Sequence, residues 1–448
     1  MALSGIEIYK FLPKTNCKEC GFPTCLAFAM KLAQKGVELS KCPYVSDEGK
    51  KALEAAARPP IRLITIGDGE RKLEVGNEVV LFRHEKTFFH PTGLVVRIKD
   101  SGGDAAVKQA AEAAAYSVER VGMNLKLNGI AVENASGNAD TFVKCVEAVK
   151  GNKVPLILMS KDAAAMEKAL EKVASDMPLI YAATKDNFAQ MAELAKKYKC
   201  PLAIYEPDSL DALADLAQKV MDTGVEDIVL DPGARDFAKS LTALTQIRRM
   251  AIKSSFQPLG FPVITFPGEG ASSDDEAAML AAQQIAKYAG IVVLDNFSSS
   301  VVYPLLTLRL NLYTDPQKPI QMTPGVYEIG SPKAESPLGV TTNFSLTYFS
   351  IAGELEASGF PSWLLVCDTE GLSVLTSWSA GKFDAAKIAK SVKEFKLADK
   401  VSHHKLILPG GVAVLRGELE EELPDWKIMV GPREAVDVGG FLKKQWTS

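Results

Sequence analysis

Eight short apolar segments recur between residues 94 and 295, and they constrain the fold more than any other feature of the sequence. Most are rich in β-branched side chains, as strands buried on both faces should be, and helical segments lie between them. Strands alternating with helices, repeated about every two to three dozen residues, predict a closed (β/α)8 barrel. An open doubly wound sheet is the structural alternative. The segments start at Leu94, Gly129, Pro155, Pro178, Pro201, Asp227, Pro262 and Ile291.

Polar residues follow these segments, at the strand ends where barrels place their catalytic groups. They include no histidine, no cysteine and no metal-binding triad, and several suit helix caps. We therefore interpret the barrel as a scaffold, with an active site at its mouth as the alternative. The aspartates predicted to cap helices are Asp162, Asp186, Asp208 and Asp274. The strand-end residues are Glu133, Asn134, Ser160, Lys161, Thr184, Lys185, Asp186, Glu206, Asp231, Glu269, Asp295 and Asn296.

The segments that flank the predicted barrel differ from it in pattern. Residues 58–60 (RPP) end a predicted helix and indicate a linker, and residues 61–92 alternate as two or three antiparallel strands do. Residues 308–337 are rich in proline and turn formers, which is typical of a second linker. The predicted domains are residues 1–57, residues 58–325, which hold the barrel with its strand cap, and residues 326–448.

Strands and helices alternate again after residue 340, in the segments SWLLVCD, KLILPGG and WKIMVGP. This pattern predicts a small open parallel sheet with helices on both faces. A loop with glycine follows each strand, with Gly371, Gly410 and Gly431 in turn. Open α/β sheets bind ligands at these strand ends, where glycine lets the backbone approach a ligand closely. None of the loops is a GxGxxG or Walker motif, so a nicotinamide or nucleoside triphosphate site is not indicated.

Four cysteines near the N-terminus have the spacing C-x2-C-x4-C-x16-C, and Pro43 follows the last of them. A [4Fe–4S] cluster takes four cysteines, often with proline after the last one. Structural zinc also takes four cysteines, but usually as two pairs. Three clustered cysteines plus one remote cysteine favour the cluster over zinc. The four candidate metal ligands are Cys17, Cys20, Cys25 and Cys42.

The composition excludes several classes of function. The chain has 448 residues, 47% hydrophobic and 24% charged, with a formal net charge of −4. This slight acidity gives no support for a nucleic-acid or membrane-surface partner. No apolar run reaches the ~18–20 residues of a membrane span. Nothing near the N-terminus resembles a secretory signal, so we expect a reducing cytoplasmic location, with Cys145, Cys200 and Cys367 as core residues.

Five stretches together resemble the large (gamma) subunit of the corrinoid iron–sulfur proteins of the anaerobic acetyl-CoA (Wood–Ljungdahl) pathway. The resemblance extends over essentially the whole chain. It implies an N-terminal [4Fe–4S] domain, a central (β/α)8 TIM barrel and a C-terminal Rossmann-like domain that holds a cobamide. The stretches are GIEIYKFLPKTNCKECGFPTCLAFAMKLA, CPYVSD, VTTNFSLTYFS, DTEGLSVL and VGPREA.

The resemblance also implies a function and partners. The family carries a methyl group on cobalt from methyltetrahydrofolate, through a separate methyltransferase, to acetyl-CoA synthase. Its [4Fe–4S] cluster reactivates Co(II) to Co(I), so the chain is a methyl carrier rather than a stand-alone catalyst. The expected partners are the small subunit in a heterodimer, the methyltransferase, acetyl-CoA synthase and a reductive activator. Two alternatives are a barrel that itself binds a pterin or folate and transfers the methyl group, and a zinc-stabilised docking protein.

The resemblance assigns residues to both cofactors. The four N-terminal cysteines match the cluster ligands with none missing. The cobamide contacts fall on Thr341, Thr342, Thr347, Gly371, Leu372, Ser373, Val374, Gly410, Gly431, Pro432, Arg433 and Glu434.

Histidine is scarce, and this bears on the cobamide. The chain lacks the D-x-H-x-x-G loop with which many cobalamin proteins supply a lower axial ligand. His403 and His404 lie in a basic, polar segment and are predicted to be surface residues. We therefore expect a base-off cobamide with no histidine ligand from the protein. Weak axial ligation would make Co(II) easier to reduce, which suits the role expected of the cluster.

Overall fold

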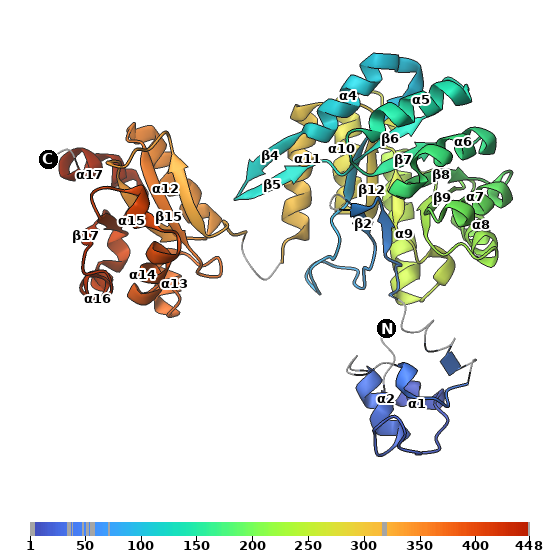
Figure 1. The fold of residues 1–448 in the computed structure, drawn as a ribbon, viewed down its shortest axis with the longest axis horizontal. Helices are drawn as coiled ribbons and strands as arrows, with labels where there is room; N and C mark the ends of the chain where they lie inside the picture. Colours follow the sequence, from blue (N-terminus) through green and yellow to red (C-terminus); the bar gives the residue numbers. More distant parts are fainter. Residues whose placement is uncertain are drawn as a thin grey trace. The chain divides into compact units, whose positions relative to one another are not determined.

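The computed structural model describes residues 5–33, 37, 39–46, 49–50, 53, 59–69, 72–315 and 320–446 (Figure 1). The chain divides into two compact units, Met1–Ser117 with Lys126–Tyr313, and Val118–Leu125 with Thr314–Ser448. The division into three domains stays a prediction. Most of the helix expected before residue 58 lies outside the described residues. Along the described part of the chain, no helix has the length and apolar character needed to cross a membrane.

The cysteine segment forms a small helical module with its own apolar core. Helices α1 (Gly5–Lys10) and α2 (Cys25–Ala33) contact each other, and the short 3₁₀-helix η1 (Leu39–Lys41) follows. The buried core consists of Ile8, Leu12, Cys25, Phe28, Ala29, Cys42, Val45 and Leu53. Two of the four candidate ligands are therefore part of this core.

All eight predicted barrel strands are present and form a closed barrel, so the open doubly wound alternative is wrong for this part of the chain. Around the barrel the strand order is β10-β11-β12-β3-β6-β7-β8-β9, and every neighbouring pair is parallel. The strands are β3 (Gly93–Lys99), β6 (Gly129–Glu133), β7 (Leu156–Met159), β8 (Leu179–Ala183), β9 (Leu202–Tyr205), β10 (Ile228–Asp231), β11 (Val263–Thr265) and β12 (Ala289–Leu294).

One helix follows each barrel strand, and these helices surround the barrel in Figure 1. Their apolar faces are buried, as the 3.6-residue periodicity of the sequence predicts. The helices are α4 (Gly103–Ala115), α5 (Ala139–Lys150), α6 (Ala163–Val173), α7 (Phe188–Tyr198), α8 (Leu210–Asp222), α9 (Phe237–Lys253), α10 (Asp274–Ala286) and α11 (Ser299–Tyr313).

The predicted strand cap is confirmed as an antiparallel pair, β1 (Ile64–Ile66) and β2 (Leu73–Val75). Side chains of both strands are buried in one cluster with inward-facing barrel residues such as Val95 and Ile157. Gly67 donates a backbone hydrogen bond of 2.9 Å to Met177, just before β8. The pair therefore closes the end of the barrel at which the strands begin.

The second unit contains a five-stranded sheet in the order β13-β15-β14-β16-β17. β13 (Gly325–Ile329) pairs antiparallel with β15 (Ser362–Cys367), so the prediction of an all-parallel sheet is wrong at this edge. β14 (Leu338–Thr342), β15, β16 (Lys405–Leu408) and β17 (Lys427–Val430) are parallel. The prediction of a linker over 308–337 is also wrong in part, because α11 extends to residue 313 and this range contains β13.

Helices cover the sheet of the second unit. α14 and α16 bury apolar side chains in the same core as β14, β15, β16 and β17, and α12 contacts β13, β14 and β15 and packs against α17. The helices are α12 (Ser345–Ser358), α13 (Val374–Ser379), α14 (Ala385–Glu394), α15 (Leu397–Lys400), α16 (Arg416–Glu422) and α17 (Val438–Gln445). Two 3₁₀-helices follow β16 and β17, η7 (Gly410–Leu415) and η8 (Ala435–Asp437).

A hairpin between α4 and β6 was not predicted from the sequence. It consists of β4 (Ser117–Arg120) and β5 (Met123–Lys126), which form a separate two-stranded sheet. Residues Val118–Leu125 belong to the second unit, although the segments on both sides belong to the first.

Candidate functional site

The N-terminal cysteines converge in a tightly wound loop. Asn16 accepts a hydrogen bond from the backbone nitrogen of Cys25 at 2.8 Å through its side-chain oxygen, and its own backbone nitrogen contacts the Cys25 sulfur at 3.4 Å. Lys18 and Gly21 have positive φ angles of 67° and 84°, which keep this turn compact. Sequence reasoning missed Asn16, although a residue that readily adopts a positive φ beside a cysteine was a usable signal.

The four thiols are close enough to influence one another. Burial raises the pKa of Cys42, and the charges of Cys20, Cys25 and Cys17 raise it further, against a hydrogen bond from the backbone of Tyr44. The four side chains therefore form one group, in which the other three thiols lie within electrostatic reach of Cys42. Among the described residues, however, no three Cys, His, Asp or Glu side chains have the separations that a single metal ion needs.

The twelve predicted cobamide residues all lie at the end of the second sheet where its parallel strands have their carboxyl ends. The strands β14 to β17 are parallel, so their carboxyl ends meet at the same edge, and each predicted residue lies in or just after the end of one of them. β15 lies on one side of β14, and β16 and β17 lie on the other. The strand order therefore reverses between β14 and β16. In open α/β sheets this switch point is where ligands bind.

Two buried hydroxyls mark the switch point. Thr341 and Thr342 end β14 and are 1% and 0% exposed. Among the described residues, neither side-chain oxygen has a hydrogen-bond partner. A buried hydroxyl without a partner costs about 1–3 kcal/mol. Consecutive side chains of a strand point to opposite faces of the sheet, so each of these hydroxyls needs a partner of its own at the end of β14.

Asn343 fixes the loop after β15, and sequence reasoning did not single it out. Its buried side-chain oxygen accepts hydrogen bonds from the backbone nitrogens of Thr369 and Gly371 and from the Thr369 hydroxyl, all at 2.9 Å. Its side-chain nitrogen donates to Gln321 and Asp368, both at 3.2 Å. Residues 369–372 therefore have a defined conformation next to β14.

Two glycine loops pack directly against each other at the same edge. Gly410 donates a backbone hydrogen bond to the Pro432 carbonyl at 3.0 Å, and Gly431 donates one to the Leu408 carbonyl at 2.8 Å. A Cβ atom on Gly410 would lie 2.5 Å from the Gly431 oxygen, which is too close for any side chain. Only glycine therefore permits this contact between the two loops.

Apolar side chains surround this edge and face solvent. Each lies in the segment that follows one parallel strand and is more than half exposed. Their side chains could cover a large, partly apolar ligand, because burying them would remove apolar surface from water. These residues, called the apolar rim below, are Leu346, Leu375, Val414 and Val436.

His403 and His404 lie at the opposite edge, just before β16 begins. Both are partly exposed, so they reach the surface as predicted, although each also packs against neighbouring groups. One ring nitrogen of His403 contacts the Ser336 carbonyl and the other accepts from the Lys405 backbone nitrogen, both at 2.9 Å. His404 stacks on Trp426 with 5.1 Å between ring centroids. Neither histidine is at the edge that carries the predicted cobamide residues.

The barrel mouth contains an ion-pair network. Arg97, 7% exposed, contacts Glu269 and Asp295 at 2.6 Å. Arg235 binds both Asp231 oxygens at 2.8 and 2.9 Å and Glu269 at 2.6 Å. Burial raises the pKa of Tyr181, and so does the nearby Asp231, to which its hydroxyl donates. Asp231, Glu269 and Asp295 are thus bound by arginines, which is compatible with a structural role for these three strand-end carboxylates.

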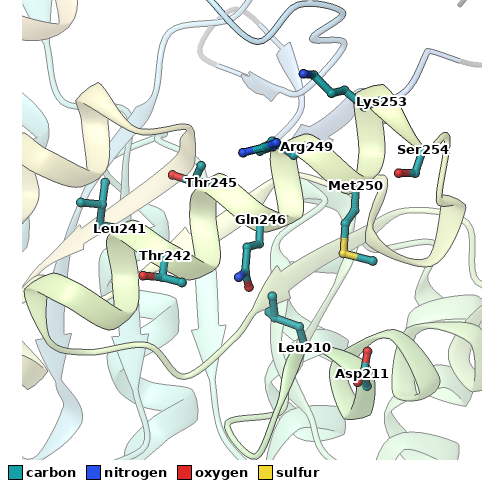
Figure 2. A pocket seen from close by; sticks show the side chains of 10 residues that line it. All are labelled: Leu210, Asp211, Leu241, Thr242, Thr245, Gln246, Arg249, Met250, Lys253 and Ser254. Atoms are coloured by element: carbon teal, nitrogen blue, oxygen red, sulfur yellow. The ribbon is translucent and has the colours of Figure 1, made fainter.

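A wide hollow of about 940 Å³ lies on the outside of the barrel between α8 and α9. Figure 2 shows Gln246 and Met250 pointing from α9 towards Leu210, whereas Arg249 and Lys253 point away. None of the predicted site residues lines it.

The fold defines a modular α/β protein, with a cysteine segment before a closed barrel and a five-stranded sheet after it. A family model described as the CO dehydrogenase/acetyl-CoA synthase delta subunit matches residues 63–442, and one described as a putative Fe–S cluster matches residues 12–44. The corrinoid/iron–sulfur protein large subunit of Moorella thermoacetica is 44% identical, with all of both chains covered.

Archaeal relatives agree with this match. The acetyl-CoA decarbonylase/synthase complex subunit gamma is 35% identical in Methanothermobacter thermautotrophicus, with 99% of both chains covered. The same subunit of Archaeoglobus fulgidus is 37% identical over 99% of this chain and 98% of its own. The chain therefore belongs to the family of corrinoid/iron–sulfur protein large subunits and acetyl-CoA decarbonylase/synthase gamma subunits. Among solved structures, dihydropteroate synthase of Thermus thermophilus is 15% identical with a TM-score of 0.39, over 56% of this chain and all of its own.

Proposed function

We propose that this chain carries methyl groups on a cobamide bound at the carboxyl edge of β14–β17. The observation that carries the proposal is the pair of buried Thr341 and Thr342 hydroxyls, which have no partner among the described residues at the point where the strand order reverses. A corrin ring has a broad apolar surface with amide groups at its periphery. The apolar rim suits the ring, and the two hydroxyls and the glycine loops suit polar groups that approach the backbone.

We propose that Cys17, Cys20, Cys25 and Cys42 hold a [4Fe–4S] cluster. A [4Fe–4S] cluster takes four cysteines, and the spacing of these four, with Pro43 after the last, fits that use, as does the match of residues 12–44 to a putative Fe–S cluster model. The backbone nitrogen of Asn16 contacts the Cys25 sulfur, and contacts of this kind help to set cluster potentials. The cluster would supply the electron that returns Co(II) to Co(I).

The cobamide supplies the methyl-transfer chemistry, and the protein positions it. We propose a methyltetrahydrofolate methyltransferase as the donor side and acetyl-CoA synthase as the acceptor side, with a small subunit and a reductive activator as further partners. The gamma subunits of acetyl-CoA decarbonylase/synthase complexes among the relatives support this assignment.

We propose that no histidine of the protein binds cobalt. Both ring nitrogens of His403 contact backbone groups, and His404 stacks on Trp426, at the edge away from the predicted cobamide residues. An EPR spectrum of the Co(II) form tests this point. We expect no nitrogen superhyperfine splitting from an imidazole, and such a splitting would contradict the proposal.

The whole assignment is tested by anaerobic metal analysis together with a visible spectrum. We expect about four Fe and one Co per chain, with iron–sulfur and corrin absorption. A colourless protein with one zinc would contradict both sites. Methyltetrahydrofolate retained by the isolated chain would instead favour methyl transfer at the barrel itself.

A further inference from the structure

The hairpin formed by β4 and β5 has a buried tip. Its two-residue turn, Val121–Gly122, has positive φ angles of 49° and 76°, the geometry of a type I′ turn. Valine is a poor residue for such a turn, since β-branched side chains rarely adopt a positive φ. Yet Val121 is only 5% exposed, whereas the tip of a free two-stranded hairpin would be solvated. Other parts of the protein must therefore cover the tip.

The contacts of Gly122 identify what covers it. A Cβ atom on Gly122 would lie 2.7 Å from the Tyr327 hydroxyl and 2.8 Å from the Thr323 hydroxyl. The Thr323 hydroxyl donates to the Gly122 carbonyl at 3.3 Å, and the Tyr327 hydroxyl donates to the Thr323 carbonyl at 2.7 Å. The turn thus packs on β13 and on the residues just before it, with no room for a side chain at position 122.

The strand before the turn contacts α12 of the second unit. The Arg120 guanidinium lies 6.0 Å from the centre of the Phe349 ring. Phe349 packs against Tyr348, which in turn packs against Tyr327, with ring centres 5.4 and 5.0 Å apart. Burial and then the Glu119 carboxylate raise the pKa of Tyr327, which also places this acidic side chain near the ring.

The base of the hairpin is held in the barrel. Arg309 of α11 donates to the Lys126 carbonyl at 3.1 Å and to the Thr92 carbonyl at 2.9 Å, and it also binds the Asn128 side chain. The Asn128 oxygen accepts from the Leu94 backbone nitrogen at 3.0 Å at the same time. α11 ends at residue 313, one turn after Arg309, and the chain then enters the second unit. One buried arginine thus binds Lys126, beside the crossing at residues 125–126, and lies four residues before the crossing at residues 313–314.

We propose that the hairpin, called the arm below, is an integral part of the second unit although the segments on both sides of it belong to the first, and that its tip binds the face formed by β13 and the start of α12. The second unit is then connected to the barrel at residues 117–118, 125–126 and 313–314, instead of through one linker. This proposal does not depend on which cofactor the second unit holds.

Hydrogen exchange on the intact chain tests the contact. Gly122→Val should make the amides of residues 118–125 and of β13 exchange about tenfold faster or more, because the tip can no longer bind. Gly137→Val is the matched control, since Gly137 also has a positive φ of 67° but no atom within 4 Å of an added Cβ. If Gly122→Val failed to fold, Arg120→Ala, which removes the contact with Phe349, should give a smaller change in the same amides. Exchange that is unaffected by these changes, or affected equally by Gly137→Val, would overturn the proposal.

A second experiment tests whether the arm holds the second unit. A protease site inserted after Asp315 is used to cut the chain between α11 and β13. After cutting, the C-terminal fragment should stay with the barrel during size-exclusion chromatography, and it should separate in the Gly122→Val variant. Separation with the natural hairpin, or equal retention in both proteins, would contradict the role of the arm.

Discussion

The side-chain oxygen of Asn343, at the end of β14, accepts a hydrogen bond of 2.9 Å from the backbone nitrogen of Gly371, in the loop after β15. The same oxygen also binds Thr369, so one buried amide determines the shape of a loop that the neighbouring strand delivers. The loop carries four of the predicted cobamide residues, 371–374. Their position depends on a residue that lies about thirty positions earlier and was not itself a predicted contact.

Replacing Asn343 should weaken cobamide binding before it unfolds the protein. Asn343→Ala leaves the Thr369 and Gly371 nitrogens without their acceptor, at a cost of about 1–3 kcal/mol in the stability of the second unit. Cobamide retention after reconstitution should fall with it. Asn343→Asp keeps the acceptor oxygen but places a carboxylate beside Asp368. This variant should lose only part of its cobamide at neutral pH, and less in acid, because protonation removes the repulsion between the two carboxylates. Equal cobamide content in all three proteins would refute the role of Asn343.

The close contact between the loops after β16 and β17 predicts that replacing Gly410 will weaken cobamide binding. Gly410→Ala forces the Gly431 backbone away, and cobamide affinity should fall about tenfold or more, measured by titration of the corrin absorption. Gly417→Ala in α16 is the control, because nothing lies within 4 Å of its added Cβ, and its affinity should be unchanged. Similar affinities for the two variants would show that this edge is not the binding site.

The barrel-mouth network should matter for stability more than for chemistry. Arg97→Met takes a charged hydrogen-bond partner from the partly exposed carboxylates of Glu269 and Asp295, and it should lower the free energy of unfolding by about 1–3 kcal/mol in urea denaturation. The control is Lys168→Met, which removes an exposed ion pair with Asp140 and should cost less than about 1 kcal/mol. Methyl transfer per folded molecule should not change in either variant. A selective loss of transfer in the Arg97 variant would assign chemistry to the barrel.

The same network should make stability depend on acid pH through Glu269. Burial alone would raise the pKa of Glu269, but Arg235 and Arg97 outweigh it and hold the pKa below its ordinary value of 4.5. A lowered pKa means that stabilisation is complete above 4.5 and is lost as the pH falls through the lower, folded-state value. The melting temperature should therefore decrease below about pH 4.5. The melting temperature should decrease less steeply with falling pH in Glu269→Gln than in the natural protein. An equal decrease in both proteins would show that Glu269 is not the group responsible.

The sequence predicted what depends on local pattern. The eight apolar segments and the helices between them specify the barrel, because each strand is buried on both faces and each helix on one. The exact N-cap residue was harder to predict where two polar residues are adjacent. Asp162 caps α6 as predicted. Ser209 caps α8 in place of Asp208, and Ser273 caps α10 in place of Asp274. Asn187 takes the cap position of α7 in place of Asp186, and its side chain binds Thr184.

Features made by distant partners could not be predicted. The hairpin tip is buried only because Thr323 and Tyr327, two hundred positions later, lie against Gly122. β13 lies in a proline-rich stretch that resembles a linker, and pairing with β15 makes it a strand. The importance of Asn343 depends in the same way on a loop from another strand.

The central claim is that one chain holds a cobamide at the carboxyl ends of β14–β17 and also a cluster that returns the cobalt from Co(II) to Co(I). The most direct measurement is reductive reactivation of the Co(II) protein in a Cys20→Ala variant, with Cys145→Ala, a buried cysteine of α5, as control. We predict that both variants retain cobamide and that only Cys20→Ala fails to return from Co(II) with the usual electron donor. Recovery of the Cys20→Ala variant at the rate of the control would contradict the role of the cluster.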